Sequence, residues 1–150
     1  MMEGWVFHLH LISAISWIGG SVFMFALGIS LRDKKAQKEV YPHVGPIFGW
    51  FEVGALIVLL LTGTLLGMDY SLFEMLFYDS SLPISDAVSK KATLVALLSM
   101  VTIIHFVIAY RTNNKERTKL EHMISRASSM LIFFLNLFVM HYAIVLRDIL

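Results

Sequence analysis

Residues 5–31 read WVFHLHLISAISWIGGSVFMFALGISL and contain no Lys, Arg, Asp or Glu. A helix needs roughly 20 apolar residues to cross the about 30 Å of hydrocarbon in a bilayer, and this stretch is longer than that. Three more apolar stretches of sufficient length follow, at about residues 44–68, 91–110 and 124–146. The sequence therefore predicts four transmembrane helices.

The composition supports the same fold. The chain has 150 residues, of which 57% are hydrophobic, whereas soluble domains contain about 45–50% apolar residues. Almost nothing remains outside the four stretches to form a water-soluble domain. We therefore predict an all-α protein with one domain, residues 1–150, folded as an integral membrane four-helix bundle in contact with the lipid bilayer. Because the chain has no cysteine, disulfides and thiolate chemistry are excluded.

The charges between the apolar stretches predict the orientation in the membrane. The first and third connections are basic and hold Arg32, Lys34, Lys35, Lys38, Arg111, Lys115, Arg117 and Lys119. The second connection is acidic for most of its length and holds Asp69, Glu74, Asp79 and Asp86. Short basic loops stay in the cytoplasm. We therefore predict a multi-pass protein of the cytoplasmic (inner) membrane, N-out/C-out, and no nucleic-acid partner, because topology accounts for the basic loops.

Three local patterns predict features within this bundle. The apolar run at residues 72–78 predicts either a short interfacial helix or a loop packed on the bundle. Pro42 and Pro46 mark the entry to the second segment, since proline suits the first turn of a helix. Gly63 and Gly67 have the spacing that lets helices pack closely in lipid, where an amide such as that of Asn136 bonds a neighbouring helix.

Two histidines have matching depths near the outer face. His10 lies about five residues into the first segment, and His141 about five residues before the end of the fourth. Imidazoles are rare in lipid and usually ligate metal, bind haem or carry protons. Two facing histidines at one level suit the axial ligation of haem b, and imidazole also suits copper. His8 lies about 200° from His10 around a helix, so both cannot face one site.

A second pair of histidines lies toward the inner face. His43 begins the second segment, and His105 lies about five residues before the inner end of the third. If they meet across the bundle, they would form a second haem site. The alternatives are an interfacial histidine at position 43 and a histidine bonded inside the bundle at position 105.

Glu52 and Lys91 are the candidate catalytic residues, because charged groups are costly within a membrane segment. Glu52 lies two turns into the second segment, where it either takes part in proton transfer or lies at headgroup level. Lys91 begins the third segment and lies within about 40° of His105 around the helix. The alternative for Lys91 is a lysine whose amine extends to the interface.

Three of these segments together resemble a superfamily of small membrane proteins that includes the copper-resistance D (CopD) proteins and the HemJ-type protoporphyrinogen oxidases. The family's first-helix histidine and Trp-x-Gly-Gly correspond to His10 and Trp17–Gly20. Its Leu-Thr-Gly corresponds to Leu61–Gly63, and its lysine-first helix to Lys91 and the segment that carries His105. The resemblance implies a four-helix membrane bundle associated with haem b, in which His10 and Lys91 hold the critical positions of HemJ-type proteins.

These observations leave open a structural subunit, whose histidines are only hydrogen-bonded within the bundle, and three functions with a cofactor, metal or substrate. The first is a haem b-binding redox protein with bis-histidine ligation by His10 and His141, which exchanges electrons with a quinone or a periplasmic carrier. The second is CopD-like copper handling, with the same two histidines as ligands and methionines as weak helpers. The third is a HemJ-like protoporphyrinogen oxidase in which Lys91 binds a propionate. A homodimer, or membership of a larger membrane complex, is compatible with each.

Overall fold

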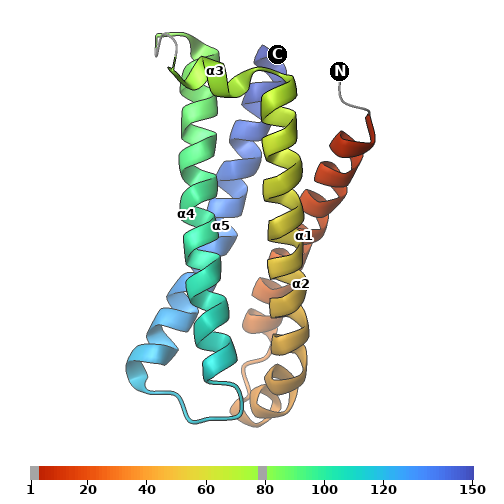
Figure 1. Ribbon diagram of the computed structural model, residues 1–150. Helices are drawn as coiled ribbons and strands as arrows, with labels where there is room; N and C mark the ends of the chain where they lie inside the picture. Colours follow the sequence, from red (N-terminus) through yellow and green to blue (C-terminus); the bar gives the residue numbers. More distant parts are fainter. Residues whose placement is uncertain (1–3, 78–80) are drawn as a thin grey trace.

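The computed structural model describes residues 4–77 and 81–150, and these residues form helices and no strand. Four long helices, α1 (Gly4–Ser30), α2 (Lys34–Asp69), α4 (Pro83–Arg111) and α5 (Lys119–Ile149), run lengthwise through the molecule (Figure 1). A short helix, α3 (Leu72–Phe77), joins α2 to α4. Each long helix is long and apolar enough to cross a membrane. The all-α prediction with four such helices is therefore confirmed.

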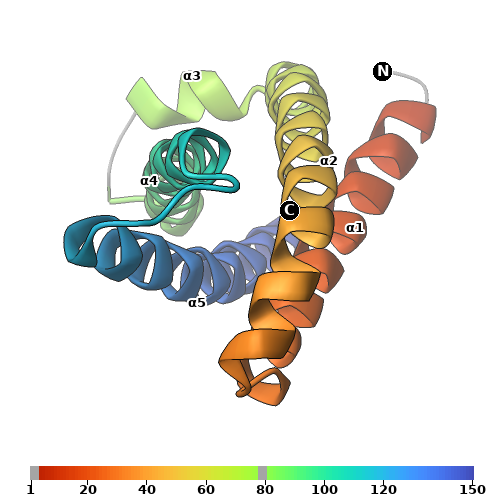
Figure 2. The same ribbon diagram turned by 90° about the horizontal axis from the view of Figure 1, so that it is seen from below.

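The molecule has two chemically different ends (Figure 1). Both termini and α3 lie at one end, called the terminal end below. The connections from α1 to α2 and from α4 to α5 lie at the other end, called the basic end. The view from below in Figure 2 shows α1 beside α2 and α4 beside α5. Toward the terminal end, α1 diverges from the other three long helices (Figure 1).

Helix α2 begins ten residues before the apolar segment predicted at 44–68. Asp33 caps it, accepting a hydrogen bond of 3.2 Å from the backbone N–H of Lys35. Pro42 and Pro46 therefore lie inside the helix, and the prediction that they mark its first turn is wrong. The capped segment before them already forms helix, and each proline removes one backbone hydrogen bond without ending it.

Helices α4 and α5 also extend beyond their apolar segments. Helix α4 begins at Pro83, so Lys91 lies more than two turns inside the helix. Helix α5 begins with a capping box between Thr118 and Glu121. The predicted short helix is confirmed as α3, which packs against α2 and α4. Tyr78, the last residue of the predicted run, and Asp79, which was predicted in the acidic connection, lie outside the described residues.

The packing of the bundle fits lipid better than water. A buried apolar cluster draws on all four long helices and consists of Trp17, Leu56, Leu98, Val101, Ile132 and Leu135. Many large apolar side chains face outward, among them Phe23, Ile47, Leu61 and Ile103. Polar side chains occupy the interior instead, among them Ser21, Glu52, Thr62, Thr102, Ser128 and Asn136. Apolar residues outside and bonded polar residues between helices are the arrangement expected of a bundle in a bilayer.

Candidate functional site

His10 lies between α1 and α2 and is fixed by one hydrogen bond. Its Nδ1 lies 2.8 Å from Oγ1 of Thr62. The Thr62 hydroxyl donates its own hydrogen to the carbonyl oxygen of Val58, at 2.6 Å. The hydroxyl oxygen must therefore accept from His10, which places the proton on Nδ1. The lone pair of Nε2 remains free to bind a metal ion or a proton.

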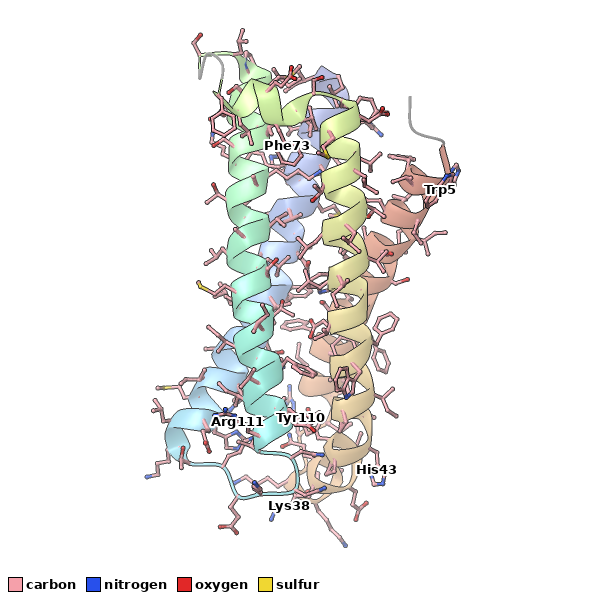
Figure 3. The ribbon with its side chains drawn as sticks, in the orientation of Figure 1. Trp5, Lys38, His43, Phe73, Tyr110 and Arg111 are labelled. Atoms are coloured by element: carbon pink, nitrogen blue, oxygen red, sulfur yellow. The ribbon has the colours of Figure 1, made fainter. Side chains whose placement is uncertain are left out.

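Gly63 makes room for the His10 ring. A Cβ at position 63 would lie 3.2 Å from Cε1 of His10, a tight contact that the ring could relieve only by moving. Gly67, one turn further along α2, has the same relation to Phe73, whose ring would lie 2.7 Å from an added Cβ. Figure 3 shows Phe73 across the top of the bundle, between α2 and α4. The predicted close packing at these glycines is confirmed, and both accommodate an aromatic ring.

Lys91 is the charged neighbour of His10. It is half-buried on α4, and its charge acts on the His10 ring. The preceding residue, Lys90, is exposed and forms an ion pair of 2.7 Å with Asp86. The two lysines therefore have different environments, although they are adjacent in sequence. Lys91 and His10 lie toward the terminal end and come from different helices.

His8 and His141 have exposed side chains. His8 donates from Nδ1 to the carbonyl oxygen of Gly4, at 2.6 Å, so it bonds only its own helix. The prediction that His8 and His10 face different directions is confirmed. The ring of His141 lies 5.3 Å from that of Tyr142, edge to face. His10 packs on α2, whereas His141 is exposed on α5, and among the described residues no hydrogen bond or ring contact joins the two.

Glu52 lies inside the bundle, not at its surface. Its exposure is 3%, although a carboxylate is costly to bury. It interacts with the indole of Trp17 on α1, but Nε1 of that indole lies outside hydrogen-bond geometry with every described group. No ion pair to Glu52 occurs among the described residues. Of the two positions predicted for Glu52, the structure gives the buried one.

His105 is held in the same way as His10. Its Nδ1 lies 2.8 Å from Oγ of Ser128 on α5. The Ser128 hydroxyl donates to the carbonyl oxygen of Ser125, at 3.0 Å. The proton of the neutral ring is therefore on Nδ1, and Nε2 is the free nitrogen. Arg117 is the charged group that acts on His105, and it reaches Ser125 at 3.2 Å.

A small cavity joins Glu52 and His105. Its volume is about 30 Å³, and all four long helices line it through Ser21, Met24, Phe48, Glu52, His105, Ser129 and Ile132. This volume is enough for about one water molecule. Ser21 is further held by the side-chain amide of Asn136, which donates to its Oγ at 3.0 Å. The predicted bond from Asn136 to a neighbouring helix is confirmed.

The structure does not bring His43 and His105 into one site. His43 is exposed and donates from Nδ1 to the carbonyl oxygen of Glu39, at 2.9 Å. Figure 3 shows it on the outside of α2, pointing away from the other helices. His105 lies inside the bundle, on the cavity with Glu52. Within residues 4–77 and 81–150, no group of three or more His, Cys, Asp or Glu residues is placed to hold a metal ion.

The site also uses residues that sequence reasoning did not single out for chemistry. Thr62 and Ser128 set the tautomers of the two inward histidines. Trp17 and Thr102 each bury a side-chain polar atom that has no hydrogen-bond partner among the described groups. Of these four residues, Thr62 and Trp17 had a signal in the sequence, through the Leu-Thr-Gly and Trp-x-Gly-Gly resemblances. Comparison of the chain with protein-family models, curated proteins and solved structures finds no match.

Proposed function

We propose that this chain is a haem b-binding redox protein of the cytoplasmic membrane, oriented with both termini outside. The observation that carries the proposal is the His10–Thr62 bond. Histidines that ligate metals almost always donate their second ring N–H to a fixed acceptor, which sets the tautomer and aims the other nitrogen. His10 has this arrangement, with its Nδ1 held by Thr62.

The proposed ligands are His10 and His141, one from each of two long helices. The residues around His10 fit the group in two respects. The tautomer offers a lone pair, and Lys91 supplies a positive charge where an acidic propionate of the haem would need one. The chemistry that a bound haem supplies is one-electron transfer, here between a quinone or a periplasmic carrier and the haem. Thr62 orients the ligand, and the apolar exterior keeps the site within lipid.

A reduced-minus-oxidised visible spectrum tests this proposal on the full chain, expressed in haem-replete cells and purified in detergent. We expect a haem b spectrum that is lost in His10→Ala and His141→Ala. The matched control is His8→Ala, since His8 lies two residues from His10 and bonds only its own helix. A colourless, iron-free wild-type protein contradicts the proposal. If the colourless wild-type protein retains copper and His10→Ala loses it, copper handling replaces haem binding as the proposed function.

One observation favours a second candidate, a HemJ-like protoporphyrinogen oxidase. Lys91 and His10, the two positions that the resemblance makes critical, lie on α4 and α1, and the charge of Lys91 acts on the His10 ring. Restoration of haem synthesis in cells that lack protoporphyrinogen oxidase tests this function. The wild-type chain should restore growth and Lys91→Gln should not. Lys90→Gln is the control, because Lys90 is exposed and paired with Asp86. Growth restored equally by Lys91→Gln contradicts the enzyme.

A further inference from the structure

The Glu52 cavity has a chemistry that the proposed haem site does not use. It lies between residues of all four long helices, and it holds the buried carboxyl of Glu52 and the ring of His105. Neither residue is a proposed ligand of the haem. A buried carboxylate without an ion pair is strongly disfavoured, so the Glu52 carboxyl is stabilised by holding a proton. It becomes a carboxylate only where a nearby base takes that proton and forms a cation beside it.

The nearby base is present and oriented. His105 donates from Nδ1 to Ser128, whose own hydrogen is committed to the carbonyl oxygen of Ser125. Its basic nitrogen is therefore Nε2, and the residue lines the same cavity as Glu52. Imidazole is the side chain best suited to exchange protons near neutral pH. The donor and acceptor thus come from α2 and α4 and meet at one internal space.

Apart from Glu52 and His105, the side chains that line the cavity are uncharged, and two of them are serines. From α1 the cavity receives Ser21 and Met24, and from α5 it receives Ser129. Arg117 lies in the connection between α4 and α5 and is the charged group that acts on His105. The buried indole N–H of Trp17 and the hydroxyl of Thr102 lack partners among the described groups. Trp17 interacts with Glu52, and Thr102 precedes His105 by about one helical turn.

We propose that Glu52 and His105 form an intramembrane proton-transfer pair bridged by one water molecule in this cavity. The Glu52 carboxyl gives its proton to the water, and the water gives one of its own protons to Nε2 of His105. Glu52 becomes a carboxylate, His105 becomes an imidazolium, and the water is regenerated. Net charge in the cavity does not change. The new charges attract one another strongly, because water is largely excluded around them.

Infrared spectroscopy of the full chain in lipid films tests the pair. At neutral pH, exposed carboxyl groups are ionised, whereas a proton held on Glu52 gives a carbonyl band of a protonated carboxyl. We expect this band in the wild type and its loss in Glu52→Gln. The matched control is Glu74→Gln, since Glu74 is exposed on α3 and its replacement should leave the band unchanged.

Transfer is tested by the rate at which the band shifts after exchange into D₂O. We expect His105→Gln to keep the band and to slow its exchange roughly a hundredfold, the scale of general acid–base catalysis. An unchanged exchange rate in His105→Gln overturns the pair. If the wild type shows no such band, the proposal is overturned. This measurement needs no variant, so it holds even if Glu52→Gln fails to fold. A metal ion retained by the wild type and lost in Glu52→Gln also overturns it.

This outcome is separable from the haem assignment, because the infrared band and the visible spectrum are recorded on one sample. A colourless protein that shows the Glu52 band and its dependence on His105 would retain the proton pair and lose the haem. A haem b spectrum without the Glu52 band would support the haem assignment and contradict the proton pair.

Discussion

At the residue scale, two hydroxyl groups decide how the inward histidines present themselves. Thr62 and Ser128 each donate to a carbonyl of their own helix and accept from an imidazole Nδ1–H. With these two hydroxyl groups donating to carbonyls, each histidine carries its proton on Nδ1. The free Nε2 is therefore a property of the helix pairs α1–α2 and α4–α5, because each hydroxyl lies on a different helix from its histidine.

The first prediction concerns Thr62→Val, which keeps the side-chain shape and removes the acceptor. We expect the His10 ring to lose its preference for the Nδ1–H tautomer, because no other acceptor is fixed in the place of the hydroxyl. Nitrogen NMR of ¹⁵N-histidine-labelled protein reports the tautomer directly. Thr64→Val is the control, since Thr64 is exposed and bonds only the Leu60 carbonyl. The same His10 signal in all three proteins would show that Thr62 does not set the tautomer.

The second prediction compares two glycines of α2. In Gly63→Ala the new Cβ would lie 3.2 Å from the His10 ring. We expect the ring to move and the variant to lose about 1–3 kcal/mol of unfolding free energy, the usual cost of overpacking. In Gly54→Ala the new Cβ would meet nothing within 4 Å, so this variant should be neutral or slightly more stable. Equilibrium unfolding in mixed detergent micelles measures both, and equal effects would contradict the packing argument.

At the scale of elements, a polar contact and a stacked aromatic pair join α1 to α5, in addition to the buried apolar cluster that contains Trp17 and Ile132. Asn136 donates to Ser21 at 3.0 Å, and the rings of Phe25 and Phe133 stack with centroids 4.4 Å apart. Both contacts lie toward the basic end, since α1 diverges toward the terminal end (Figure 1). The hydrogen bond between Asn136 and Ser21 is thus the polar part of a pairing that is otherwise apolar and aromatic.

The third prediction is a double-mutant cycle between Asn136→Leu and Ser21→Ala. We expect a coupling free energy of about 0.5–1.5 kcal/mol, as for other hydrogen bonds between membrane helices. Equilibrium unfolding of the four proteins measures it. Ser99→Ala replaces Ser21→Ala in the control cycle, because Ser99 bonds only the Val95 carbonyl, and there the coupling should vanish. Equal coupling in both cycles would indicate a general loss of stability.

The elements also show what the sequence could and could not predict. The four helices followed from the length of the apolar segments, because a bilayer imposes that length on any spanning helix. The start of α2 did not, since the cap of Asp33 and the charged turns after it contain no apolar signal. Helical spacing predicted that His8 and His10 face different directions, but it did not predict that Thr62 is the partner of His10. Contacts between helices depend on rotation and tilt, which a single segment does not encode.

At the scale of the whole molecule, the polar residues divide between two levels of an apolar bundle. His10 and Lys91 lie toward the terminal end, and Glu52 and His105 lie toward the basic end. Fixed charge is concentrated at the basic end, where Figure 3 shows Lys38 and Arg111. In a membrane, this distribution gives the two levels different access to the two aqueous phases. The orientation of the bundle therefore decides which phase lies nearer His10 and the proposed haem site, and which lies nearer Glu52 and the proposed proton pair.

The last prediction tests that orientation with single cysteines, which are unambiguous because the chain has none of its own. Lys35→Cys and Lys115→Cys place an exposed thiol at the basic end, and Glu74→Cys places one on α3. Since short basic connections remain in the cytoplasm, a membrane-impermeant maleimide added to intact spheroplasts should label only Glu74→Cys. Permeabilised cells, in which all three should react, are the control for thiol accessibility. Labelling of the two basic-end cysteines in intact spheroplasts would invert the bundle, and the Glu52–His105 pair would then lie nearer the periplasm than His10.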